Sequence, residues 1–90
     1  MTIKQAKELK RGSVILINHI TGKDELARVV RWDERAQGID YHAISGGGSI
    51  CKPEHIIKVL DEKPFYESEI WAQAWKEKWN ENYKRSRNAL

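Results

Sequence analysis

The sequence predicts a mainly β protein with one long helix: residues 1–62 form a small five-stranded β-barrel, and residues 63–90 form a C-terminal amphipathic helix. Two observations favour this fold class. Short segments of β-branched or alternating residues, separated by glycine, asparagine and aspartate, fill the first part of the chain. Residues 65–87, by contrast, contain no glycine or proline. With 90 residues, the chain fits a single domain with a modest core.

A short helical turn is predicted before the first strand. Thr2 and Gln5 have the spacing of a capping box, and Gly12 suits the C-terminal end of the turn. The strands are then predicted at residues 13–17, 26–32, 39–43, 49–52 and 56–60, with a long loop at 18–25 and one tight helical turn at 53–55.

Alternation predicts which strand residues share a face. The third strand has one wet face, because polar residues alternate with apolar ones along it. In the second strand, one face is predicted to carry Leu26, Arg28, Val30 and Trp32, and the other Ala27, Val29 and Arg31.

A break is predicted at residues 61–64, before the helix. Pro64 disfavours a helical conformation at Lys63 and suits the first turn of a helix itself. The helix is expected from about residue 65 to 87, with acidic residues near its start and basic residues near its end, as the helix dipole favours.

Two segments carry a resemblance to a known family. Residues 8–15 (Glu-Leu-Lys-Arg-Gly-Ser-Val-Ile) and residues 53–60 (Pro-Glu-His-Ile-Ile-Lys-Val-Leu) resemble the first-strand approach and the closing segment of the Src-homology-3-like small barrel. The similarity covers roughly residues 8–60. Such barrels host unrelated functions, so the resemblance implies a fold and not an activity.

The sequence resembles some branches of that family more than others. Readers of proline-rich peptides need aromatic residues near the first strand and long loop, whereas residues 14–25 contain no Phe, Tyr or Trp. The chain is closer to the branches that touch nucleic acid or protein through loops and an exposed barrel face.

Charge and cysteine content narrow the function further. The net charge of +3 is mild, but basic residues gather at both ends of the chain. These basic ends either bind the phosphates of a nucleic acid or only keep the termini soluble. Cys51 is the single cysteine, so no intramolecular disulfide forms. No apolar run approaches the ~20 residues that cross a bilayer. We therefore expect a cytoplasmic protein.

The most informative local feature is an aromatic stripe on the predicted helix. Its members recur every fourth residue and so share one face, which must be covered because it exceeds the apolar patch a monomer usually exposes. Either the stripe folds back on the barrel and completes its core, or it forms a partner groove or self-association seam, and a homodimer is one form of the latter. The stripe consists of Trp71, Trp75, Trp79 and Tyr83.

Nucleic-acid binding draws on other side chains. Arginines beside an aromatic residue on a strand can pair phosphates and stack a base, or else form ion pairs with neighbouring acids while the tryptophan covers the core. The candidates are Lys4, Lys7, Lys10 and Arg11, then Arg28, Arg31 and Trp32, then Lys84, Arg85 and Arg87.

Catalysis and metal binding find little support. Cys51 and His55 have no evident orienting group, and a zinc site would need His19, His42, His55 and Cys51 to converge. The glycines at 46–48 lack the lysine of a phosphate-binding loop. No catalytic residue, metal or cofactor is expected.

These observations lead to two functional hypotheses. The first is a non-catalytic binding module or adaptor that contacts nucleic acid, or a nucleic-acid-bound complex, through the barrel and the basic ends. The alternative is a protein-binding inhibitor or regulator, of the kind that small phage accessory proteins supply, which acts through the tryptophan face of the helix.

Overall fold

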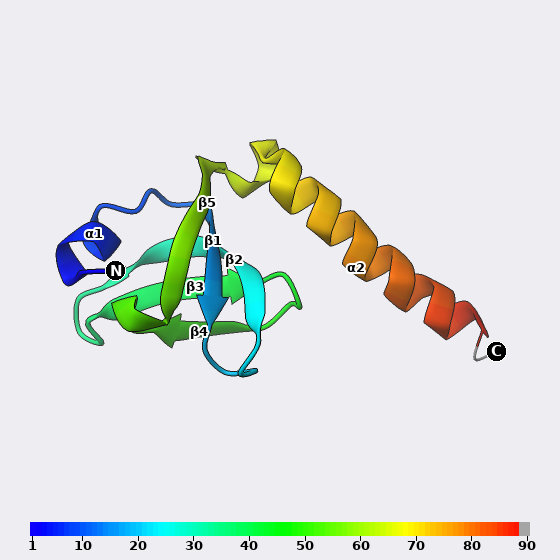
Figure 1. Cartoon of the computed structure of the whole chain (residues 1–90), viewed down its shortest axis with the longest axis horizontal. Coiled ribbons are helices and arrows are strands. Elements are labelled where there is room, and N and C mark those ends of the chain that lie inside the picture. The colour runs from blue at the N-terminus through cyan, green and yellow to red at the C-terminus, as the bar shows by residue number, and fades with distance from the viewer. Residues whose placement is uncertain (89–90) are drawn as a thin grey trace.

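The computed structural model describes the backbone of residues 1–88 and the side chains of residues 1–79. It confirms a mainly β protein with a five-stranded antiparallel sheet and a C-terminal helix (Figure 1). The elements are α1 (Ile3–Lys7), β1 (Ser13–Asn18), β2 (Asp24–Asp33), β3 (Gly38–Ala43), β4 (Gly48–Cys51), η1 (Pro53–His55), β5 (Ile56–Pro64), η2 (Phe65–Glu67) and α2 (Glu69–Asn88).

The sheet has the strand order β4-β3-β2-β1-β5, and each neighbouring pair is antiparallel. β4 and β5 are the two edge strands, and they do not pair with each other within the described residues. The closed barrel that the sequence predicted is therefore not confirmed, because the last step of closure is absent from this sheet.

The main core lies on the inner face of the sheet. Ile15 and Ile17 of β1 pack there against Val29 of β2 and Tyr41 of β3, all at most 1% exposed. The short helix α1 adds Ala6 to this cluster. Its predicted capping box is present, since the Gln5 N–H donates to Thr2 Oγ1 (3.1 Å) and the Thr2 N–H to Gln5 Oε1 (2.9 Å).

A bulge in β2 overturns part of the predicted face assignment. Val29 pairs with Tyr41 and Arg31 with Asp40, so Val30 is an extra residue without a partner in β3. Beyond Val30 the alternation is reversed. Trp32 consequently packs on the main core, while Arg31 lies on the outer face with Arg28. The prediction that Trp32 shares a face with Arg28 was wrong.

β5 is also longer than predicted, because it continues through the expected break at residues 61–64. Pro64 pairs with Ser13, and the next N–H, that of Phe65, donates to the Gly12 carbonyl at 2.7 Å. Gly12 adopts φ 87°, in the region that favours glycine. The turn η2 follows, and α2 begins after Ser68, whose Oγ accepts the Trp71 N–H at 3.2 Å.

Candidate binding groove

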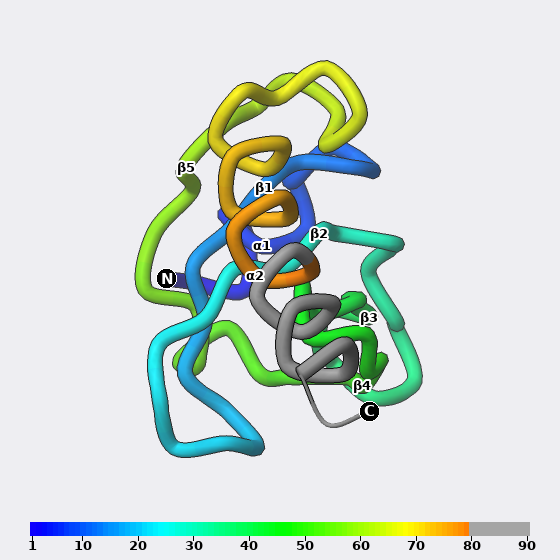
Figure 2. Tube along the Cα trace, turned by 90° about the vertical axis from the view of Figure 1, so that its right-hand side faces the viewer, coloured from blue at the N-terminus to red at the C-terminus, as the bar shows by residue number. Residues whose placement is uncertain are grey.

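Helix α2 is anchored to the outer face of the sheet through its first turns. Trp71 is only 7% exposed and packs with Val14 of β1 and Ile44, which together form a second buried cluster. Phe65 and Ala74 are partly buried against the same cluster. The rest of α2 extends away from the side of the sheet that carries α1 (Figure 1), and the first turns stand in front of the strands in Figure 2.

The aromatic rings of this region form one continuous row. Ring centroids are 5.6 Å apart for Phe65 and Trp71, 6.3 Å for Trp71 and Trp75, and 5.1 Å for Trp75 and Trp79. Trp71 is 7% exposed, whereas Trp75 and Trp79, further along the row, are 45% and 37% exposed. The row therefore begins inside the second cluster and ends in solvent.

The far end of the row faces back toward the sheet. A Cβ atom on Gly46, in the turn between β3 and β4, would lie 3.9 Å from the Trp79 ring. The members of the stripe thus differ: Trp71 completes a core, whereas Trp75 and Trp79 remain exposed. Tyr83 lies outside the residues whose side chains are described.

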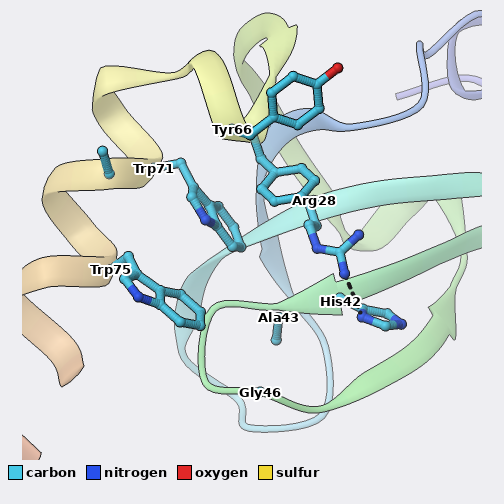
Figure 3. A pocket seen from close by; sticks show the side chains of 9 residues that line it. Arg28, His42, Ala43, Gly46, Tyr66, Trp71 and Trp75 are labelled. Atoms are coloured by element: carbon cyan, nitrogen blue, oxygen red, sulfur yellow. Dashed lines mark hydrogen bonds between the residues drawn. The ribbon is translucent and has the colours of Figure 1, made fainter.

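A groove of about 520 Å³ separates α2 from the outer face of the sheet. Trp71 and Trp75 form its helix side, and Arg28 and His42 lie on its sheet side (Figure 3). We call this site the aromatic groove. Its lining residues are Arg28, His42, Ala43, Gly46, Phe65, Tyr66, Trp71, Ala72 and Trp75.

Arg28 is the cationic group of the aromatic groove. Its guanidinium carbon lies 4.5 Å from the centroid of the Phe65 ring, a cation–π distance. Its Nη2 lies 3.0 Å from His42 Nδ1 (dashed in Figure 3). Because a guanidinium only donates, Nδ1 must accept, and the neutral His42 ring then carries its proton on Nε2. No carboxylate lies within 4.0 Å of the Arg28 guanidinium in the part of the protein whose side chains are described.

A second cleft continues from the aromatic groove. It has a volume of about 410 Å³, shares Arg28, Phe65 and Tyr66 with the groove, and adds Arg11 at its other end. Tyr66 is 75% exposed between the two. Two of the predicted nucleic-acid candidates, Arg11 and Arg28, are thus brought to one surface beside exposed aromatic rings.

Other predicted nucleic-acid candidates are engaged within the protein. Arg31 lies 3.4 Å from Asp33 and 3.7 Å from Asp40. Trp32 packs on the main core and donates its indole N–H to Glu34 at 2.7 Å. This hydrogen bond is the largest of several effects that lower the pKa of Glu34. These contacts match the alternative in which the arginine pairs with acids and the tryptophan covers the core.

The remaining basic candidates do not gather at the aromatic groove. Lys7 lies near Trp32 instead, with its Nζ 3.6 Å from Glu34 and 5.6 Å from the Trp32 ring centroid. Lys4 and Lys10 are exposed and do not line the groove. Lys84, Arg85 and Arg87 lie outside the residues whose side chains are described.

The cysteine and histidines are distributed over two regions. Burial raises the pKa of the Cys51 thiol to about 11, so the thiol is protonated at neutral pH. His19 Nδ1 lies 2.9 Å from Tyr41 Oη, and the His19 ring contacts the His55 ring at a tilt of 40° with centroids 4.5 Å apart. His42 lies apart, at the groove. Among the described residues, no three His, Cys, Asp or Glu side chains are placed to hold a metal ion.

Sequence reasoning missed part of the aromatic groove. Phe65 and Tyr66 were not singled out, and His42 was considered only as a metal ligand, although two adjacent aromatic residues at the start of a predicted helix were a usable signal. The tilted ring contact of His19 with His55 had no signal in the sequence, because it joins a loop and a turn far apart along the chain.

Comparisons with protein-family models, curated proteins and solved structures give no match for this protein. Helices in the described part of the sequence are too short or too polar to cross a bilayer.

Proposed function

We propose that the protein is a non-catalytic protein-binding module, an adaptor or regulator, that takes a segment of a partner protein in the aromatic groove. One observation carries the proposal: Trp75 and Trp79 stay 45% and 37% exposed although their rings continue a packed row that starts in a core. Tryptophan, tyrosine and arginine side chains in a partly desolvated pocket are typical anchors of protein interfaces.

The energetics favour a covering partner. Each aromatic side chain buries ~150–250 Å² when fully covered, at roughly 25 cal/mol for each Å². Folding recovers this free energy for Trp71, but only in part for Trp75 and Trp79. A partner that covers the two rings recovers the remainder, which is the source of affinity in this proposal.

The test is affinity capture from a host lysate treated with nuclease. A Trp75→Ala variant is compared with an Ile70→Ala variant, since Ile70 is 43% exposed on the same helix but does not line the groove. We expect a protein captured by the wild type and the Ile70 variant to be lost with the tryptophan variant. Capture that is equal for all three proteins would contradict the proposal.

Nucleic-acid binding is a second candidate, favoured by the shared cleft of Arg11 and Arg28 beside Tyr66. Single-strand binders combine a cationic track with aromatic platforms. Fluorescence anisotropy with a labelled oligothymidylate across a salt series tests it. A log–log slope of roughly 0.7 for each phosphate neutralised would support this candidate, and an absence of binding at low salt would remove it.

The Src-homology-3-like small barrel stays our proposal for the fold class. The single turn η1 directly before β5, and the pairing of β5 with β1, support it.

A further inference from the structure

The polar side chains of the aromatic groove offer hydrogen-bond donors and no carboxylate acceptors. None of its lining residues is Asp or Glu, whereas Arg28 and His42 both present N–H donors. Within the described side chains, the indole N–H groups of Trp71 and Trp75 have no hydrogen-bond acceptor. The groove therefore supplies donors and one positive charge, and its occupant must supply acceptors.

Arg28 is held in an orientation suited to a carboxylate. The guanidinium lies against the Phe65 ring at 4.5 Å, and its Nη2 is tied to His42 at 3.0 Å. Two contacts on different sides of the group fix its plane, so little side-chain entropy is lost when a ligand binds. A guanidinium has five N–H donors, and the contact with His42 uses one of them. The remaining edge can bind both oxygens of a carboxylate.

The apolar part of the groove determines which anion fits. Besides Arg28, the lining is dominated by the rings of Phe65, Trp71 and Trp75 and by two alanines, and no further Lys or Arg belongs to it. A phosphodiester strand running along the helix would meet a single cation there. A peptide with one acidic group beside a large apolar side chain matches the groove better in both charge and polarity.

Resting on the proposed function of the aromatic groove, we infer that its partner is a short protein segment that combines a carboxylate with an adjacent large apolar side chain. The carboxylate is an Asp or Glu side chain or the free C-terminus of the partner, and it pairs with Arg28. The apolar side chain packs against the exposed Trp75 ring, beside Trp71. Both parts of the segment are needed for binding. The aromatic rings of the groove provide most of the buried area, and the Arg28 guanidinium selects acidic segments from among apolar ones.

The test begins with a random linear peptide display library selected on the full-length protein. Parallel selections use Arg28→Gln, which removes the charge, and Trp75→Ala, which removes one wall of the groove. We expect the wild type to enrich peptides with an acidic residue, or a free C-terminal carboxylate, at a fixed short distance from an aromatic or aliphatic residue. The Arg28 variant should enrich apolar peptides without the acidic preference, and the Trp75 variant should enrich neither class.

The most enriched acidic peptide is then made in two forms, with the carboxylate and with the matching amide, and titrated by tryptophan fluorescence. For the wild type the amide should bind about tenfold more weakly, the ordinary strength of a charge-assisted pair. For Arg28→Gln this difference should vanish, and Arg28→Lys should restore part of it. Circular dichroism of each variant establishes that the sheet is retained.

The possible results distinguish a failure of the inference from a failure of the proposed function. Enriched peptides that need Trp75 but carry no acidic residue would overturn the inference and leave the groove as a peptide site. Equal binding of the acid and amide forms to the wild type would do the same. An absence of peptides that depend on Trp75 would overturn both. Oligothymidylate that binds more tightly than any selected peptide, and depends on Arg28 and Trp75, would assign the groove to nucleic acid.

Discussion

The two faces of the sheet are completed to different degrees. On the inner face, Ile15, Val29 and Tyr41 are at most 1% exposed, and strand pairing together with α1 seals the cluster. On the outer face, α2 covers Val14 with Trp71 and leaves Trp75 nearly half exposed. The difference shows that large aromatic side chains alone do not make a core. An aromatic side chain must be enclosed on several sides to form a core, and on α2 this holds for Trp71 but not for Trp75.

The largest effect is expected at the residue that joins the two regions. Replacing Trp71 by Ala removes the anchor of α2 from the second cluster and should lower the free energy of unfolding by about 3–5 kcal/mol. Urea denaturation followed by circular dichroism measures this loss. If α2 instead remained helical and the unfolding midpoint stayed at the wild-type value, the second cluster would not contribute to the stability of the fold.

A small deletion in the main core should have an intermediate effect. Ile15→Val removes one methylene from a fully buried position and should cost about 1 kcal/mol, because the surrounding side chains cannot close the gap. The same urea experiment applies, with an unchanged denaturant slope as evidence that the compactness of the two states is retained. A cost near zero would mean that the inner face is as loosely filled as the outer one.

Removal of the half-exposed indole of Trp75 should cost far less than removal of the buried indole of Trp71. Trp75→Ala is expected to lower the free energy of unfolding by about 1 kcal/mol, since the ring is already 45% exposed and alanine favours the helix. Differential scanning calorimetry of the variant beside Ile70→Ala provides a comparison on the same helix. A cost similar to that of Trp71→Ala would assign Trp75 to the core and weaken the proposed groove.

The smallest effect concerns the neighbouring histidines His19 and His55. Burial, and to a lesser extent the nearby His55, lower the pKa of His19 from 6.5. The unfolded state therefore binds a proton at a higher pH than the folded state does. Stability should be constant above about pH 7.5 and fall as the pH drops through 6.5 toward the lowered folded pKa.

This pH dependence can be isolated with two variants. The stability obtained from thermal unfolding between pH 7.5 and 5 should depend less on pH in His19→Gln and in His55→Gln, because each variant removes one member of the neighbouring pair. A wild-type stability that rises on acidification would show that protonation stabilises the pair, opposite to the direction expected from the lowered pKa of His19.

Much of this arrangement could be predicted from local sequence patterns. Alternation and β-branched runs predicted the strands, and the absence of glycine and proline predicted α2. Arg11, Arg28, Trp71 and Trp75 were named as binding residues and lie along the groove or its neighbouring cleft, whereas Trp32 and Trp79 line neither. These features are readable because each depends on side-chain identity at short range.

Features set by tertiary pairing could not be predicted. The polar residues 61–64 extend β5 because Ser13 is available as a partner, which no local pattern encodes. An extra residue such as Val30 leaves the alternation of β2 readable in two ways, so Trp32 was placed on the wrong face. The groove itself arises where η2 turns α2 back over the sheet, so no local pattern places Tyr66 and His42 at one site.

The Val30 bulge also has an evolutionary consequence. It absorbs one residue of β2, so that Trp32 lies on the core with Ala27 and Val29, while Arg31 lies on the outer face with Arg28. Deleting Val30 would restore regular alternation and leave Arg31 and Trp32 on these same faces, whereas keeping Val30 without the bulge would exchange them. Relatives of this protein should therefore vary in length at the exposed loop at residues 20–23 and also tolerate the loss of one residue at Val30.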